Sequence, residues 1–447
     1  MEDIQNIEVI RNRKNIAIAI FLILDFIQIA FVSFLTFDEQ SPLVIGFDLA
    51  RANPYSSISV FTSICVAQVL LIYLFVASII NKKEMIQLYP EYDESQKLPC
   101  DFARDEIVDW TQKLAQEASV DVDRIFLLHS PIPNAFTFSL PIVGNAIVLH
   151  SNTLDFLLPS EVESIIAHEL GHIKNKDSII NILTHMPGFF VQLIYLYVYL
   201  RLGLAAATSF IVDFNPLFGM LRIAILVSFF FLSRFMVNLS RLFTKKASRD
   251  AELLGDFYSA EMTESNQTMN ALIRLGQRVE TVTIFAEELR WLDSLSEENR
   301  CKLTGEQLRE IIFSYPLDEI DETNAREEAP RIYLTRKLEN LREDYKLKIS
   351  DEEIKEAIDP AVESLSLARK TKTKLENLED KTVNWREVDY NSDKRLNKEE
   401  LADLVKLLKS NPTKLMFTNE VGAKLLMIDH PDFRKRILTL AKHFPLE

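Results

Sequence analysis

The chain contains few of the residues that build disulfide-stapled or repetitive proteins. It has three cysteines, 10 glycines and 16 prolines in 447 residues. These low numbers exclude a disulfide scaffold, a collagen-like chain and a low-complexity chain, and the lack of a disulfide framework favours an intracellular location. Basic residues are also in deficit, because the net charge is −15. A polyanion binder needs a basic face to displace counterions, so nucleic acid is not expected as a partner.

Long apolar runs are abundant and alternate with strongly charged segments. Four runs extend over residues 15–37, 58–80, 179–200 and about 223–239. About 20 apolar residues can cross a bilayer as a helix, so the runs predict about four transmembrane helices in two hairpins. A buried core helix is the alternative for each run, and it is stronger for the last two, which contain His185, Pro187 and Arg234. The first run is longer than the apolar part of a signal peptide, which predicts an anchor.

Basic residues flank the runs on one predicted side of the membrane. They are Arg11, Arg13 and Lys14, Lys82 and Lys83, Lys174 and Lys176, and Arg241, Lys245, Lys246 and Arg249. By the positive-inside rule, the N-terminus, the segment around residues 82–177 and everything after the fourth run lie in the cytoplasm. The connection around residues 213–216 then lies outside. We expect an integral protein of the cytoplasmic (inner) membrane, or of an organelle membrane, with its active site facing the cytoplasm.

A pattern that carries chemistry lies between the two pairs of runs, at residues 161–172. Its apolar residues recur at helical spacing, and Pro159 and Ser160 precede it, with Ser160 as the expected cap. His168 and His172 lie one turn apart and can bind one zinc ion, and Glu169 can take a proton from a zinc-bound water. Two surface histidines that share a helix by chance are the alternative.

A third protein ligand is needed, and Glu252 and Asp256 offer carboxylates one turn apart just after the fourth run. One can complete a His/His/Glu site, while the other accepts the second ring N–H of a ligand histidine. A solvated acidic face is the commoner fate of such a pair.

Four motifs follow one another along the chain. They are Pro133-Asn134-Ala135-Phe136, Ala167 to Asn175, Ser248-Arg249-x-x-Glu252-x-x-x-Asp256, and His430-Pro431-x-x-x-x-Arg436-Ile437. Together they resemble those of the HtpX-type integral-membrane zinc metalloproteases, which are relatives of the CaaX prenyl proteases. Their order and their interleaving with apolar runs follow the family. The resemblance covers about residues 1–260 and the last few dozen residues.

The resemblance implies a role for each matching residue. His168, His172 and Glu252 would bind one catalytic zinc ion, and Glu169 would act as the general base. Asp256 would not bind the metal itself but would accept a hydrogen bond from a ligand histidine. Asn134, Ala135 and Phe136 would bind an extended peptide by strand addition, on a small β-sheet that an alternation of apolar residues at 146–149 also supports. The expected fold is mainly α, with a gluzincin-like metalloprotease domain that contains this sheet.

The segment between Asp256 and His430 is longer than the family spacer, and it contains a loop that resembles an EF-hand. Loop positions 1, 3, 5, 7, 9 and 12 are Asp389, Asn391, Asp393, Arg395, Asn397 and Glu400. Lys394 replaces the glycine of position 6 and must then adopt a positive φ. No second loop is visible in the sequence. Ca²⁺ is therefore a second cofactor to consider, and a vestigial or purely structural loop is the alternative.

The sequence also predicts how the chain is divided. We expect an N-terminal transmembrane hairpin at 1–84, the first catalytic part at 85–177, a second hairpin at 178–240, the third-ligand helix at 241–262, a charged helical insertion at 263–410 and the C-terminal catalytic part at 411–447. Within the insertion we expect helices at 332–347 and 351–370 and a linker at 318–328.

These features predict a membrane-embedded zinc metalloendopeptidase. It would hydrolyse peptide bonds of membrane or misfolded proteins at the cytoplasmic face, as in protein quality control, with an extended polypeptide and the lipid bilayer as its partners. A CaaX-type prenyl-peptide processing protease is disfavoured, because four runs fall short of the larger membrane chamber of those relatives. A non-catalytic, calcium-responsive membrane scaffold is disfavoured by the intact Glu169, and a calcium-regulated protease lies between the two readings.

Overall fold

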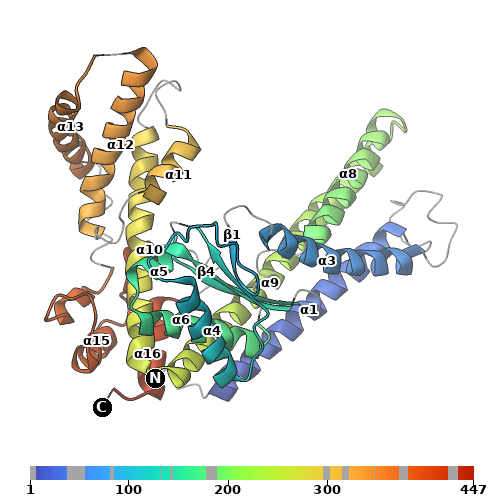
Figure 1. Ribbon diagram of the computed structural model, residues 1–447. Coiled ribbons are helices and arrows are strands. Elements are labelled where there is room, and N and C mark those ends of the chain that lie inside the picture. Colours follow the sequence, from blue (N-terminus) through green and yellow to red (C-terminus); the bar gives the residue numbers. More distant parts are fainter. Residues whose placement is uncertain are drawn as a thin grey trace. The chain divides into compact units, whose positions relative to one another are not determined.

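The computed structural model describes residues 7–37, 56–80, 85–130, 132–140, 144–177, 189–294, 303–314, 322–346, 348–371, 381–420 and 431–446. The chain is mainly helical and contains one small mixed sheet, as predicted (Figure 1). It forms two compact units, one of residues 1–82, 175–254 and 425–430, and one of residues 83–174, 255–424 and 431–447. The boundary after Leu254 falls inside a single long helix.

The first unit is built from long apolar helices. They are α1 (Ile7–Phe37), α3 (Ser56–Ile80), α8 (Phe189–Ile211) and α9 (Pro216–Met262). Within the described residues, three of them, α1, α3 and α9, contain spans long and apolar enough to cross a membrane, and the apolar part of α8, Tyr195–Ile211, is shorter. The described residues therefore do not confirm the predicted count of four. Helix α8 also extends past the predicted end at Leu200, and the start of the predicted run, with His185, lies outside the described residues.

These helices share a small core and leave much apolar surface exposed. The core contains Ile29 and Val32 of α1, Ile64 of α3, Tyr195, Val198 and Leu202 of α8, and Phe229 and Val237 of α9. Outside it, large side chains such as Leu74, Leu204 and Phe231 are more than half exposed. Apolar side chains at such positions suit contact with lipid chains, because the bilayer interior is itself apolar.

Two of the basic residues used to predict the orientation are engaged in ion pairs. Lys14 of α1 is buried and binds the buried carboxylate of Asp177, and Arg13 binds Asp250 of α9 through both carboxylate oxygens. These two charges are therefore neutralised locally, which weakens their part in the positive-inside argument.

The second unit contains the sheet, with strands β1 (Met85–Tyr89), β2 (Arg124–Leu128), β3 (Ala135–Leu140) and β4 (Gly144–His150). The strand order is β1-β2-β4-β3, in which β4 runs parallel to β2 and antiparallel to β3. The four residues 146–149 of β4 are all fully buried. The predicted strand is confirmed, but the predicted alternation is wrong. The apolar residues are continuous because both faces of this central strand are covered.

Helices α4 (Arg104–Ala118) and α6 (Pro159–Lys174) share a core with one face of this sheet. Ile125 and Leu127 of β2 and Ile147 and Leu149 of β4 meet side chains of both helices there. A short helix, α5 (Ser151–Phe156), links β4 to α6. The chemistry-bearing helix α6 is thereby held against β3 and β4 by a shared apolar core.

Helix α10 (Ser265–Ser294) organises the rest of this unit (Figure 1). Its second half packs with α11 (Gly305–Ser314) and α12 (Glu322–Tyr345), and α12 packs with α13 (Asp351–Thr371). The two helices predicted at 332–347 and 351–370 are confirmed, but the predicted linker is wrong where residues 322–328 open α12. Ala325 and Ala329 are fully buried against α10, so packing overrides the acidic and proline-bounded local sequence.

Helix α10 also contacts two C-terminal elements, η3 (Thr418–Glu420) and α16 (Phe433–His443). Helix α15 (Lys398–Ser410) packs on α16 and on η2 (Trp385–Val388). Phe417 is fully buried here, and a Cβ atom at Gly276 of α10 would overlap its ring. This close approach ties the C-terminal elements to the helix that also packs on α6.

Candidate metal centre

Helix α6 begins at Pro159, two residues earlier than a cap at Ser160 would allow. Leu158 occupies the N-cap position, because its carbonyl accepts from the Val162 N–H at 2.9 Å. The Leu158 N–H donates to Glu161 Oε2 at 2.8 Å, which is the carboxylate half of a capping box. Ser160 lies in the first turn and is not the cap. Pro159 suits the first helical position, since its missing N–H has no partner to lose there.

The predicted ligands lie together and are buried. His168, His172 and Glu252 each offer one ligand atom, and these three atoms lie within 4.8 Å of one another. The two Nε2 atoms of His168 and His172 are 3.1 Å apart. Two imidazoles and a carboxylate are donors that zinc uses in catalytic sites, where they leave a fourth position open. The donor set and its spacing therefore fit a zinc ion.

Asp256 orients the first histidine. Its Oδ1 atom lies 3.1 Å from His168 Nδ1, so Nδ1–H donates to the carboxylate and Nε2 is left as the ligand atom. Arg436 of α16 donates to both oxygens of Asp256, from Nε at 2.7 Å and from Nη2 at 2.5 Å. Burial alone would raise the pKa of Asp256, but Arg436 and the contact with His168 hold that pKa below its usual value. Asp256 is thus kept as a carboxylate.

Two glycines allow helices α6 and α9 to approach closely at this place. A Cβ atom at Gly255 of α9 would lie 2.7 Å from the His168 ring, and one at Gly171 of α6 would lie 2.9 Å from Tyr258 Cβ. Neither distance occurs for real side chains, so a Cβ atom at either position would force the His168 ring or Tyr258 to move. The histidines can therefore reach the last turns of α9 only because both positions lack a side chain.

The other residues predicted for catalysis and substrate binding lie near this helix in the fold. Glu169 follows His168 on α6 and is 5% exposed. Ala135 and Phe136 begin β3, an edge strand of the sheet, and Asn134 precedes it. The backbone of Asn134 is already engaged, because its N–H and carbonyl both bond to Thr153 Oγ1 and its carbonyl also accepts from the His150 N–H. An incoming strand would therefore use β3 beyond Asn134.

The loop 389–400 has the backbone of an EF-hand loop without support for calcium. Lys394 adopts φ +63°, as position 6 requires, and its N–H donates to Asp389 Oδ2. The side chain of Arg395 turns instead to Glu161 of α6. Among the described residues, the only group of histidine, cysteine and acidic side chains that could hold a metal ion is the one at His168. The prediction of a calcium site is therefore unsupported.

Two arginines matter more than the sequence indicates. Arg436 stands in the terminal motif, but the sequence does not predict that it pairs with Asp256. Arg395 is expected in a calcium loop, whereas its side chain binds Glu161. The signal available was chemical: an arginine within an apolar helical pattern, such as Arg436 beside Ile437, needs a buried acid. Of the same terminal motif, His430 lies outside the described residues.

A helix-borne His-Glu-x-x-His pair that meets a third carboxylate is the arrangement of zinc-dependent peptidases. The chain belongs to peptidase family M48, whose family model matches residues 103–443. The resemblance to HtpX-type proteases is thereby confirmed.

Curated relatives carry the same family name and match only part of the chain. "Protease HtpX homolog 1" of Sulfurisphaera tokodaii is 29% identical over 35% of this chain and 49% of its own length. "Protease HtpX homolog 1" of Sulfolobus acidocaldarius is 37% identical over 16% of this chain and 24% of its own length. The chain thus spans about half the length of the first relative and about a quarter of the second. No solved structure matches the chain.

Proposed function

We propose that this protein is a membrane-embedded zinc metalloendopeptidase. The observation that carries the proposal is the buried group of His168, His172 and Glu252, with Glu169 next to the first histidine. Three protein ligands are the number that leaves a catalytic zinc ion one open position. Membership of a peptidase family agrees with this reading.

Each residue has a defined task in the proposed reaction. When bound, zinc would supply Lewis acidity for the scissile carbonyl and lower the pKa of water. Glu169 would take the proton of the attacking water and pass it to the leaving amine, as general base and then general acid. Asp256 would hold His168 through Nδ1, and Arg436 would keep Asp256 ionised.

The proposed substrate is an extended segment of a membrane or misfolded protein. Strand β3 is an edge strand, and peptide backbones can bind to such an edge by strand addition. Helix α9 supports a site near the membrane surface, because it contains an apolar span and also Glu252. Glu252 lies 13 residues after Leu239, or about 20 Å along the helix at 1.5 Å per residue. We place this site at the cytoplasmic face, because the basic residues that flank the apolar runs, apart from the ion-paired Arg13 and Lys14, favour that side by the positive-inside rule.

The test compares zinc content and cleavage of an unfolded model protein in detergent. The parent should hold one zinc ion and cleave. Glu169→Gln should keep zinc and lose about a hundredfold or more in kcat, and Glu252→Ala should lose zinc affinity. Glu163→Gln, the same change six residues earlier on helix α6, is the matched control and should cleave like the parent.

Two outcomes would contradict the proposal. A parent that holds no zinc and takes up none would remove the metal site. A zinc-loaded parent that cleaves neither the unfolded protein nor membrane proteins would favour a non-catalytic scaffold.

A further inference from the structure

The EF-hand-like loop is held in shape by its own hydrogen bonds. Asp389 Oδ2 accepts from the Lys394 N–H at 3.0 Å, and Asp393 Oδ1 accepts from the Arg395 N–H at 2.8 Å. Glu400 accepts from the N–H groups of Tyr390 at 3.0 Å and Asn397 at 2.8 Å. The carboxylates that would bind a cation thus bond to the loop's own backbone.

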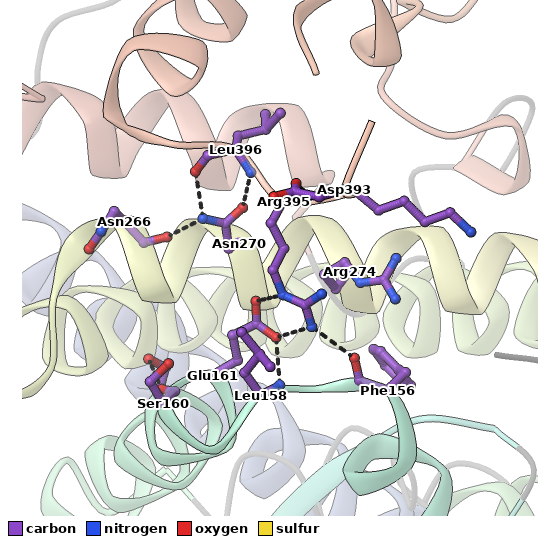
Figure 2. A network of polar contacts seen from close by, with 12 residues as sticks. Phe156, Leu158, Ser160, Glu161, Asn266, Asn270, Arg274, Asp393, Arg395 and Leu396 are labelled. Carbon is purple, nitrogen blue, oxygen red and sulfur yellow. Dashed lines mark hydrogen bonds and ion pairs between the residues drawn. The ribbon is translucent and has the colours of Figure 1, made fainter. Parts of the chain in front are cut away.

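One side chain leaves the loop and reaches the start of the metal-binding helix (Figure 2). Arg395 Nε donates to Glu161 Oε1 at 2.9 Å, and its Nη2 donates to Glu161 Oε2 at 3.2 Å and to the Phe156 carbonyl at 3.3 Å. The guanidinium therefore binds both oxygens of one carboxylate and the carbonyl of the residue that ends α5. Such bidentate geometry fixes orientation as well as distance.

Glu161, the acceptor of this ion pair, is buried in the first turn of the metal-binding helix. Its side chain is only 3% exposed and also accepts from the Leu158 N–H, which caps α6. Seven residues, or about two helical turns, separate Glu161 from His168. A buried carboxylate without its cation is strongly destabilising, so loss of Arg395 would strain the first turn of the helix that presents both histidines.

A second contact anchors the loop to α10. The amide of Asn270 donates to the Leu396 carbonyl and accepts from the Leu396 N–H, both at 2.8 Å (Figure 2). Arg274 lies one turn further along α10, among the same charges. Burial and the charge of Arg395 lower its pKa, and the charges of Glu161 and Asp389 only partly oppose this. Helix α10 thus binds the loop through Asn270.

We propose that Arg395 is a positioning residue for the metal-binding helix, and that the loop 389–400 is a calcium-independent clamp that holds the N-terminus of α6 through Glu161. The inference rests on the proposed function for its consequence in catalysis, because a misplaced α6 would misplace His168, Glu169 and His172. The clamp itself is a property of the folded chain.

The test is hydrogen–deuterium exchange of α6 in the full-length, zinc-loaded protein, together with kcat and KM. Arg395→Met should speed exchange in the first two turns of α6 by about tenfold or more and lower kcat more than it raises KM. Arg395→Lys should give an exchange rate and a kcat between those of the parent and Arg395→Met. An ammonium group cannot bind both oxygens of Glu161 and the Phe156 carbonyl in the same planar geometry. Arg331→Met, which removes an exposed ion pair with Asp359, is the matched control and should leave α6 unchanged.

A double variant separates a clamp from general destabilisation. Adding Glu161→Gln to Arg395→Met removes the unpaired buried charge, so exchange in α6 should return part of the way to the parent value. Additive effects of the two changes, or equal exchange in Arg395→Met and the parent, would overturn the proposal. So would protection of the loop by millimolar calcium in the parent. A parent that cleaves nothing but shows the expected exchange pattern would refute the proposed function and leave the clamp intact.

Discussion

At the scale of single residues, the site depends on buried charges that satisfy one another. Asp256 is 1% exposed and lies between His168 and Arg436. A buried carboxylate is costly unless it is paired and hydrogen-bonded. The arginine therefore maintains the negative charge that orients the histidine, although it does not touch the ligand atoms.

This arrangement predicts that Arg436→Met weakens metal binding. Loss of the guanidinium leaves Asp256 without its cation and weakens its hold on His168. Loss of the partner of a ligand histidine typically costs about 10-fold to 100-fold in metal affinity. Titration against a competing chelator measures the zinc Kd. Lys435→Ala changes the exposed neighbour on α16 and serves as the control. Equal zinc affinity in Arg436→Met and the parent would argue against this role of Arg436.

A second residue predicts how stability depends on pH. Glu420 of η3 accepts from the N–H groups of Phe417 and Phe433, and burial raises its pKa to about 7. The folded state then binds this proton more tightly than the unfolded chain, whose carboxyl titrates near 4.5. Stability contributed by the protonated group is therefore lost as the pH rises from about 4.5 to about 7.

The expected result is a melting temperature that falls more steeply with pH in the parent than in Glu420→Gln. The difference should reach a few degrees between about pH 5 and about pH 8, because the amide stays neutral throughout. Thermal unfolding in detergent measures it, and Glu387→Gln, at an exposed position, is the control. Parallel curves for the parent and Glu420→Gln would show that this carboxyl is already ionised at pH 5.

At the scale of elements, the site depends on how closely α6 and α9 approach. Glycine is normally unfavourable in a helix, by about 1 kcal/mol relative to alanine. Gly171 and Gly255 are retained within helices at positions where a Cβ atom would collide with the neighbouring helix. The two glycines thus lower helix propensity but allow a close crossing of α6 and α9, which brings His168 and His172 close to Glu252 and Asp256.

Gly255→Ala should therefore disrupt the metal site although it improves helix propensity. The new Cβ atom would lie 2.7 Å from the His168 ring, and overpacking of this kind costs about 1–3 kcal/mol. We expect zinc affinity to fall about tenfold or more by chelator competition. Gly203→Ala in α8 is the matched control, since no atom lies within 4 Å of its Cβ position. The control should keep full zinc affinity; the same loss in both variants would rule out a steric cause.

At the scale of the whole molecule, the number of membrane crossings decides the orientation. Three helices meet the length and apolarity needed, and α8 does not within the described residues. Helices α8 and α9 are joined by only four residues, 212–215. If both cross the bilayer, they form a hairpin whose tip lies on the side opposite to the proposed active site.

Labelling of single cysteines from each side of sealed membranes tests this orientation. In a cysteine-free background, Glu94→Cys should react with an impermeant maleimide only from the cytoplasmic side. Phe214→Cys, at the 83% exposed tip, should react only from the other side. Reaction of both positions from one side would exclude a crossing hairpin of α8 and α9.

The sequence by itself determined the local features of this protein. The helical period around His168, the apolar spans and the order of the four motifs depend on neighbouring residues, and they led to the correct helix, sheet and family. Two local predictions were wrong. Residues 322–328 were expected in a linker but form the start of α12, and Ser160 was expected as the cap of α6, whereas the cap is Leu158.

Only the tertiary structure decided which distant residues meet. Arg436 lies 180 residues from Asp256, and Arg395 lies 234 residues from Glu161. A charged residue on a helix or in a loop is usually solvated, and nothing in its neighbourhood along the chain says whether the fold will bury it against a particular partner. These pairings depend on how α10, α15 and α16 pack. The same packing places the loop 389–400, which resembles a calcium site in sequence, where its Arg395 supports the metal-binding helix α6.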